Sequence, residues 1–457
     1  MHAINSAGKA EIMTGSGKTN TTKATKFIVS PGGKLKGAMR VPGDKSISHR
    51  SIMLGSLADG VTEIEGFLDG EDNLATLNAF RAMGVEIEGP ERGKVVIHGV
   101  GIDGLQAPAE DVYLGNAGTS MRLLTGLFAA QKFDTTLTGD ASLTTRPMRR
   151  VTDPLSTMGA RFETSEAGTP PVKIHGDQRL CGIDYEMPVA SAQVKSSLLL
   201  AGLYANGQTC VTEPASTRDH TERMLRGFGY PVQTSGNKVC LLGGGRLTAT
   251  KIDVPADISS ATFFMVGASI APGSNIMLRH VGINPTRTGV ITILKLMGAD
   301  IELSNESEIG GEPVADIHVK SSKLKGIKIP EDQVPLAIDE FPAIFIAAAC
   351  AEGETVLTGA KELRVKESDR IQAMADGLTE LGIGAEAKEE GIVIQGGELS
   401  GGTINSCGDH RIAMSFAMAA LRATSPITIL DCANVNTSFP SFAKLAELTG
   451  LKIWVGE

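Results

Sequence analysis

Hydrophobic and polar positions along this chain follow a pattern that repeats six times. In each unit an apolar, helix-like run ends at a glycine and passes into an extended segment in which apolar and polar residues alternate. A glycine suits a helix end because it adopts the left-handed conformation there without steric cost. The repeat predicts a mixed α/β fold of six similar units. The glycines, at near-regular spacing, are Gly84, Gly159, Gly229, Gly298, Gly382 and Gly450.

A second apolar segment in each unit predicts a buried helix. Polar or charged residues stand in its first turn, and the rest is almost wholly apolar. A helix N-terminus attracts anions, because its unpaired N–H groups point outward and the helix dipole is positive there. We therefore expect buried helices whose N-termini converge on an anionic ligand. The segments are 46–58, 118–130, 191–205, 258–270, 339–351 and 409–421.

Length and charge narrow the class of protein. At 457 residues the chain is too long for one hydrophobic core, so we expect two domains of three units each. A net charge of -9 leaves no basic surplus to neutralise phosphates, which argues against a nucleic-acid partner. The longest apolar runs, such as 343–351, are too short to span a membrane. We expect a cytoplasmic monomer that acts on small molecules.

The cysteines and the N-terminal residues do not indicate a functional site. Six scattered cysteines form no CxxC pair, and we expect reduced thiols. Residues 1–25 are rich in Gly, Ser, Thr, Asn and Lys and are interpreted as a disordered tail or an expression remnant. The segment 15–19, GSGKT, resembles the end of a phosphate-binding loop, but Ile12 stands where that loop needs a glycine. We interpret it as a chance match.

Candidate chemistry gathers at the starts of the buried helices. One such segment alone is typical of helix capping and surface charge, but recurrence at the same position in five units indicates a shared site. Arginine side chains bind carboxylate or phosphate through two parallel hydrogen bonds. A substrate with several negative charges fits this set, and no metal-ligand spacing is present, so we expect neither a metal nor a cofactor. The segments are 42–50, 114–122, 145–150, 191–195, 218–222, 338–342, 364–370 and 408–411.

These segments resemble the 5-enolpyruvylshikimate-3-phosphate synthase family over most of the chain, from about Pro31 onward. The matching motifs are GDKSISHR (43–50), GNAGTSMRLL (115–124), TRPMRR (145–150), SAQVKS (191–196), STRDHTERML (216–225), ELRVKESDRI (362–371) and DHRIAM (409–414). The segments GDKS, SAQVK, RDHTE and Asn284–Arg287 resemble its class II branch.

The resemblance implies a fold of two domains, each built from three βαβαββ units around inward-facing helices. The two chain crossings are expected near Pro42 and Pro255. One domain would then be 43–254, and the other would combine 26–42 with 255–457. The active site is expected in the cleft between them.

The reaction implied belongs to the shikimate pathway, which leads to chorismate and the aromatic amino acids. It transfers the enolpyruvyl group of phosphoenolpyruvate to the 5-hydroxyl of shikimate 3-phosphate and releases phosphate. By resemblance, Asp339 takes the hydroxyl proton, while Lys45 and Glu367 serve the methylene carbon and the departing phosphate. An acid and a base facing one small space suit this addition and elimination.

The resemblance also implies which residues bind each substrate. Those expected at shikimate 3-phosphate are Lys45, Ser46, Arg50, Ser191, Ala192, Gln193, Arg218, Asp339 and Lys366. Those expected at phosphoenolpyruvate are Lys45, Gly118, Arg146, Gln193, Arg370 and Arg411. Glyphosate occupies the phosphoenolpyruvate site in this family, and we expect it to inhibit, since Gly118 leaves room that an alanine methyl group would fill.

Two other functions stay open at this point. The sister transferase that acts on UDP-N-acetylglucosamine has the same architecture but uses a cysteine acid in its second unit, and residues 1–180 contain no cysteine. A non-catalytic anion-binding protein on the same scaffold would need the arginines. It would not need the carboxylates Asp339 and Glu367 among them.

Overall fold

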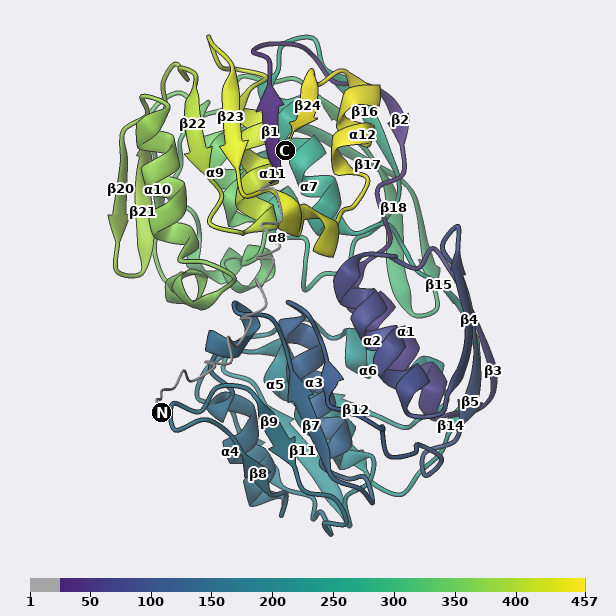
Figure 1. The fold of residues 1–457 in the computed structure, drawn as a ribbon. Helices are drawn as coiled ribbons and strands as arrows, with labels where there is room; N and C mark the ends of the chain where they lie inside the picture. Colours follow the sequence, from purple (N-terminus) through teal and green to yellow (C-terminus); the bar gives the residue numbers. More distant parts are fainter. Residues whose placement is uncertain (1–24, 457) are drawn as a thin grey trace, which may run out of the picture.

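Two lobes make up the computed structural model, which describes residues 25–456 (Figure 1). The lower lobe in Figure 1 is formed by the purple to teal part of the chain, and the upper lobe by the teal to yellow part together with the first strands. The expected tail and the GSGKT segment lie outside the described residues. No described helix has the length and apolar character needed to cross a bilayer.

The lower lobe contains three small sheets, each covered by helices on its inner side. The sheet orders are β14-β3-β5-β4 with β15 beside β3, β6-β7-β9-β8, and β10-β11-β13-β12. The strands are β3 (Ala58–Glu65), β4 (Glu86–Glu91), β5 (Lys94–Val100), β6 (Val112–Tyr113), β7 (Thr135–Thr138), β8 (Phe162–Glu163), β9 (Val172–Ile174), β10 (Asp184–Glu186), β11 (Gln208–Thr212), β12 (Gln233–Ser235), β13 (Lys238–Leu242), β14 (Leu247–Thr248) and β15 (Lys251–Asp253). The helices are α1 (Lys45–Leu57), α2 (Glu71–Ala82), α3 (Gly118–Phe128), α4 (Arg149–Thr157), α5 (Ala192–Gly202) and α6 (His220–Gly227).

The upper lobe repeats this plan with sheets β22-β23-β1-β24, β17-β18-β16-β2 and β19-β21-β20. Its strands are β1 (Lys26–Val29), β2 (Lys36–Met39), β16 (Asn275–Gly282), β17 (Asp300–Ile309), β18 (Glu312–Lys320), β19 (Glu354–Leu357), β20 (Ala385–Lys388), β21 (Gly391–Gln395), β22 (Gly402–Asn405), β23 (Ile427–Leu430) and β24 (Ile453–Gly456). Its helices are α7 (Ile258–Ile270), α8 (Gly289–Leu296), α9 (Phe341–Ala349), α10 (Arg370–Glu380), α11 (His410–Ala419) and α12 (Phe442–Thr449), with short 3-10 turns that include η3 (Pro335–Ala337), η4 (Lys361–Val365) and η5 (Ala433–Thr437).

The expected buried helices are α1, α3, α5, α7, α9 and α11, so the mixed α/β fold of repeated units is confirmed. In α7 every residue is buried, because apolar side chains occupy all sides of the helix. The fifth helix begins at Phe341 instead of at Asp339, since residues 335–337 form the separate turn η3. Pro342 suits the first helical turn, where an N–H has no intrahelical acceptor.

Each lobe has its own hydrophobic core. One core contains buried residues from 47 to 254, and the other contains residues from 27 to 41 and from 256 to 451. The two crossings lie side by side: the Asp44 N–H donates to the Pro255 carbonyl at 2.8 Å, and the Asp257 N–H donates to the Pro42 carbonyl at 2.9 Å. These cores support our proposal of domains 43–254 and 26–42 plus 255–457, hinged near Pro42 and Pro255.

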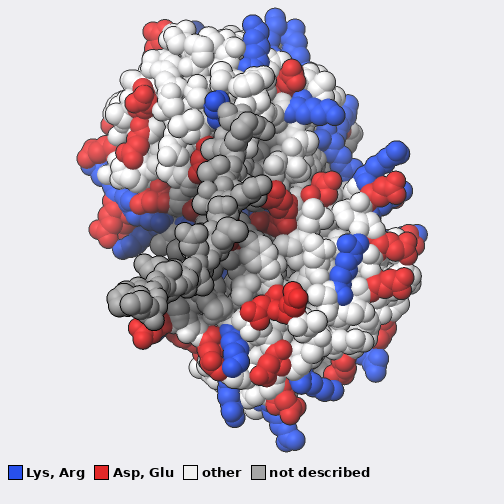
Figure 2. Space-filling view, viewed as in Figure 1, with Lys and Arg blue, Asp and Glu red and all other residues white. Residues whose placement is uncertain are grey.

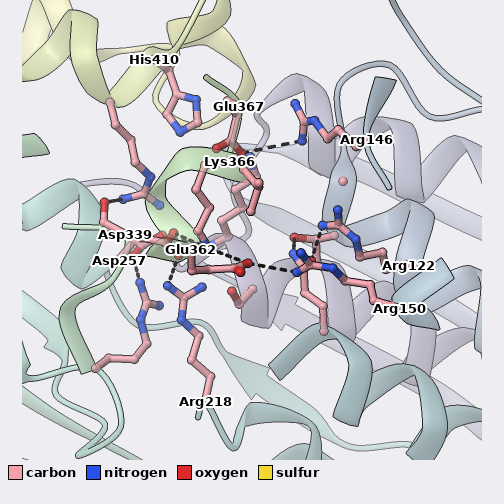
Figure 3. A pocket seen from close by; sticks show the side chains of 18 residues that line it. Arg122, Arg146, Arg150, Arg218, Asp257, Asp339, Glu362, Lys366, Glu367 and His410 are labelled. Atoms are coloured by element: carbon pink, nitrogen blue, oxygen red, sulfur yellow. Dashed lines mark hydrogen bonds and ion pairs between the residues drawn. The ribbon is translucent and has the colours of Figure 1, made fainter. Parts of the chain in front are cut away.

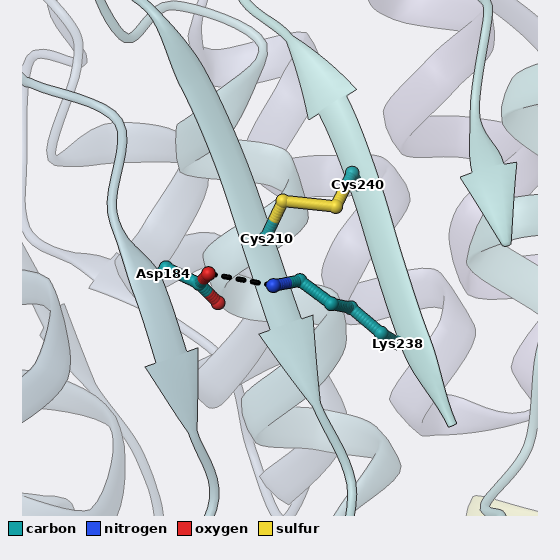
Figure 4. Close-up of a disulfide and its surroundings, with 4 residues drawn as sticks. All are labelled: Asp184, Cys210, Lys238 and Cys240. Carbon is teal, nitrogen blue, oxygen red and sulfur yellow. Dashed lines mark hydrogen bonds and ion pairs between the residues drawn. A yellow bond between two sulfur atoms is a disulfide. The ribbon is translucent and has the colours of Figure 1, made fainter. Parts of the chain in front are cut away.

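One sequence-based prediction is wrong. Cys210 and Cys240 form a disulfide, although we expected all six cysteines to be reduced (Figure 4). Strands β11 and β13 pair antiparallel in a register that places Cys210 directly opposite Cys240. Residues opposite each other in this way share a face of the sheet, and this pairing is invisible in the spacing along the sequence. The other cysteines, 181, 350, 407 and 432, are free.

Candidate active site

A cavity of about 90 Å³ lies between the lobes where the buried helices begin (Figure 3). We call it the cleft. On the described face in Figure 2, acidic and basic side chains are mixed over both lobes, whereas the lining of the cleft is dominated by charge. Its lining residues are Lys45, Ser46, Gly118, Thr119, Arg122, Arg146, Arg150, Gln193, Arg218, Asp257, Arg287, Asp339, Glu362, Val365, Lys366, Glu367, His410 and Arg411.

Local capping explains why helices start here. Carboxylate side chains of Asp44, Asp257 and Asp409 accept hydrogen bonds from N–H groups in the first turns of α1, α7 and α11. The Ser191 hydroxyl caps α5 in the same way. A cap satisfies one donor that the helix itself leaves unpaired, and the remaining donors and the dipole favour anions. The expected convergence of helix N-termini is therefore present.

Three ion pairs between lining residues join the lobes across the cleft, and the lining residue Arg287 also pairs with Asp44 of the lower lobe. From the lower lobe, Arg150 contacts Glu362 at 3.0 Å and Arg146 contacts Glu367 at 3.8 Å. Arg218 donates to the Asp339 carboxylate. The arginines of one lobe therefore meet carboxylates of the other.

Asp339 is held by cations from both lobes. Its carboxylate lies 3.4 Å from Lys366 Nζ and 3.4 Å from Arg370 Nη1, in addition to its pair with Arg218. Burial by itself would raise the pKa of Asp339, but Lys366, Arg218, Arg411 and Arg370 hold it well below its usual value. The carboxyl group is therefore ionised and can accept a proton.

Glu367 is ionised for a similar reason. Its carboxylate accepts from Arg370 Nη2 at 2.6 Å. Burial opposes ionisation, yet Arg370 and Arg146 keep the pKa of Glu367 well below its usual range. Glu367 can carry and donate a proton only when these cations bind another anion in its place.

The side chain of Lys45 points at Asp72, a residue of α2. The lysine ammonium donates to the Asp72 carboxylate, and the backbone N–H of Lys45 donates to Asp257 at 3.1 Å. Burial raises the pKa of Asp72, although Lys45 acts in the opposite direction. Asp72 therefore fixes the ammonium of Lys45 beside the cleft.

Four expected residues do not line the cleft. Arg50 is buried and donates to Thr221 at 2.7 Å and to Ser196 at 2.8 Å. Arg370 is 1% exposed behind Glu367 and Asp409, and donates to Asp409 at 2.8 Å. Ser191 and Ala192 line an adjoining cavity of about 490 Å³, which shares Gln193, Arg218, Asp339 and Lys366 with the cleft. The other expected residues lie together in the cleft.

Sequence reasoning missed several residues of the lining. Arg122 lies four positions after Gly118, so helical spacing alone places both on one face of α3. Glu362 and Val365 belong to a motif in which only Lys366, Glu367 and Arg370 were selected. No local signal marks Asp257 and Arg287 as neighbours, because they lie 30 residues apart in the sequence and meet only in the folded chain. Among the described residues, no group of three or more His, Cys, Asp or Glu side chains could hold a metal ion.

A repeated two-lobe fold with opposed cations and ionised carboxylates in its cleft defines an enzyme for small polyanionic substrates. Comparison with known proteins agrees. The family described as EPSP synthase (3-phosphoshikimate 1-carboxyvinyltransferase) matches residues 29–445. The chain belongs to this family, and it is an enzyme of that transferase class. The expected family and enzyme class are confirmed.

Relatives match over nearly the whole chain. The 3-phosphoshikimate 1-carboxyvinyltransferase of Methylococcus capsulatus is 70% identical, with 94% of this chain and 98% of the relative covered. That of Nitrosococcus oceani is 68% identical, with 94% and 97% covered. A solved EPSP synthase from Acinetobacter baumannii is 62% identical and has a TM-score of 0.86, with 95% of this chain and 100% of that chain covered. These names support the main interpretation over the UDP-N-acetylglucosamine alternative.

Proposed function

We propose that the cleft transfers the enolpyruvyl group of phosphoenolpyruvate to the 5-hydroxyl of shikimate 3-phosphate and releases phosphate. The observation that supports this most is the pair of ionised carboxylates, Asp339 and Glu367, set among cations of both lobes. A protein that only binds anions gains nothing from carboxylates at this place, since they repel the ligand.

Asp339 is the proposed base. It is ionised, and Arg218 and Lys366 hold its oxygens at the junction of the cleft with the adjoining cavity. The adjoining cavity is also lined by Ser191, Ala192 and Gln193, which are expected at shikimate 3-phosphate. A hydroxyl bound there lies beside a carboxylate that can take its proton.

Lys45 and Glu367 are proposed to share the proton transfers at the methylene carbon and the departing phosphate. In the structure without substrate, Arg146 and Arg370 hold Glu367 in its ionised form. When phosphoenolpyruvate binds these arginines with its own anionic groups, their effect on Glu367 weakens and the pKa of Glu367 rises. Substrate binding would thus prepare Glu367 to carry a proton.

Arg146 and Arg411 line the cleft and are proposed to hold phosphoenolpyruvate, with Arg370 supporting them from behind Glu367. Arg50 would reach shikimate 3-phosphate only by leaving its contacts with Thr221 and Ser196. Glyphosate inhibition, a monomeric state and a cytoplasmic location also stay proposals.

Acceptor specificity tests the function. Phosphate release is measured from phosphoenolpyruvate with either shikimate 3-phosphate or UDP-N-acetylglucosamine as the second substrate. We expect release with shikimate 3-phosphate alone. Release with the nucleotide sugar would favour the sister transferase, and binding of shikimate 3-phosphate without release would favour the anion-binding protein.

A further inference from the structure

Arg122 differs from the other permanent cations that line the cleft. Each of the others has a carboxylate within 4.0 Å: Lys45 has Asp72, Arg146 has Glu367, Arg150 has Glu362, Arg218 and Lys366 have Asp339, Arg287 has Asp44 and Asp257, and Arg411 has Glu340. Among the residues that the structure describes, Arg122 has no carboxylate within that distance. Arg122 therefore has no ion-pair partner of its own, although Glu362 and Glu367 act on its charge from a greater distance.

The side chain of Arg122 is buried and faces the cleft (Figure 3). Its residue is 8% exposed, and its Nε has no hydrogen-bond partner. Nη1 lies 3.6 Å from the place where a Cβ on Gly118 would be, so the guanidinium stands beside the first residue of α3. The Nε–H group is buried without a partner, and the residue as a whole lines the cleft.

The charge persists although its surroundings oppose it. Burial, followed by the neighbouring cations Arg150 and Arg146, lowers the pKa of Arg122 to about 10. Arg122 thus stays protonated at neutral pH. A buried charge without an ion-pair partner destabilises the free protein, and an anionic ligand reduces this penalty.

Within residues 25–456, the side chain of Arg122 makes one hydrogen bond, and its acceptor belongs to a residue expected at the substrate site. Nη1 donates to Gln193 Oε1 at 2.5 Å, and Gln193 Nε2 donates to Thr119 Oγ1 at 3.1 Å. A side-chain amide presents an acceptor on one side and donors on the other. Because Arg122 binds the amide oxygen of Gln193, the NH2 group of Gln193 points away from Arg122. A flipped amide would instead turn its oxygen toward an anionic substrate.

We propose that Arg122 is a further binding and positioning residue, which fixes the amide of Gln193 with its donors toward the substrate and supplies a positive charge without an ion-pair partner for phosphoenolpyruvate. This inference rests on the proposed function. It predicts that loss of Arg122 affects the Michaelis constant of phosphoenolpyruvate more than turnover, since Arg122 acts on binding.

The test compares Arg122→Met, Gln193→Met and the double variant with wild type. The control is Arg149→Met, because Arg149 lies outside the cleft and donates to the Glu166 carbonyl. We expect Arg122→Met to raise KM for phosphoenolpyruvate at least about tenfold with a smaller change in kcat, as loss of a charged hydrogen bond predicts. The KM of the double variant should be no higher than that of the more impaired single variant, because both substitutions remove the same Arg122–Gln193 interaction.

Several results would overturn the proposal. One is a KM of Arg122→Met for phosphoenolpyruvate that lies within twofold of the values for wild type and for Arg149→Met. Another is a fold-change in KM for the double variant that equals the product of the two single fold-changes. If Arg122→Met does not fold, Arg122→Lys takes its place, since it keeps the charge but loses the planar fork. A raised KM with near-normal kcat is again expected, and a wild-type KM contradicts it. Absence of phosphate release by wild type would instead reject the proposed function.

Discussion

At the scale of single residues, burial and neighbouring charge decide which proton each group of the cleft holds. Asp339 and Glu367 are ionised because cations surround them, and His410 is neutral because burial is the largest influence on its ring. The same groups therefore link folding stability to pH. His410 gives the clearest case, because its pKa falls to about 3, far from its value of about 6.5 in an unfolded chain.

We predict that His410 makes the protein less stable as pH falls from 7 to 5. Below about pH 6.5 the unfolded chain binds a proton at this histidine that the folded chain does not, so the free energy of unfolding falls. At pH 5 the loss from one such residue is about 2 kcal/mol. Urea unfolding of His410→Gln should show a pH dependence that is smaller by about this amount. Identical slopes for variant and wild type would mean that His410 titrates normally when folded.

At the scale of elements, we propose that the start of α3 sets how much space phosphoenolpyruvate has. A Cβ on Gly118 would lie 2.7 Å from Arg146 Nη1, which is too close, so the arginine must move. The helix cannot retreat, since a Cβ on Gly126 of the same helix would lie only 2.1 Å from the Ser197 carbonyl of α5. A methyl group at position 118 therefore acts through Arg146.

We predict that Gly118→Ala raises KM for phosphoenolpyruvate and raises the inhibition constant of glyphosate more, because glyphosate is the longer ligand. Gly227→Ala is the control, since a Cβ there meets nothing closer than 3.9 Å. Steady-state kinetics with both ligands gives the two constants. Equal changes in both would show that residue 118 does not set the length of this site.

The positions of the buried helices are what the sequence predicted best. Apolar segments with polar first turns located α1, α3, α5 and α11, and thereby Lys45, Gly118, Gln193 and Arg411. The same logic could not reveal Asp72, because its partner Lys45 is brought to it by the packing of α1 on α2. Arg50 and Arg370 follow the same pattern, but their side chains donate to other protein groups. The sequence could not show this, because it does not reveal which cations have partners inside the protein.

At the scale of the whole molecule, the chain contributes unequally to its two lobes. The lower lobe is one continuous segment with its own core, whereas the upper lobe needs β1, which pairs with β23 and β24 near the other end of the chain. Sequence periodicity cannot show such a long-range strand pairing. The resemblance to the family supplied only the expectation that residues 26–42 join residues 255–457 in one domain.

We predict that residues 43–254 fold alone as a separate polypeptide. Their core is independent of the upper lobe, so urea should unfold the fragment in one cooperative transition. A fragment covering 255–457 should not do so, because without residues 26–42 the strand β1 is missing from the middle of its sheet. A fragment 43–254 without a cooperative transition would contradict the proposed domain boundary.

The central claim is that the ionised carboxylate of Asp339 takes the hydroxyl proton in a cleft that both lobes complete. Single-turnover phosphate release by Asp339→Asn tests it most directly, with calorimetry of shikimate 3-phosphate binding on the same sample. The amide keeps the shape of the carboxylate but cannot accept the proton, so we predict binding within about tenfold of wild type and a rate at least about 100-fold lower. Phosphate release near the wild-type rate would contradict the claim.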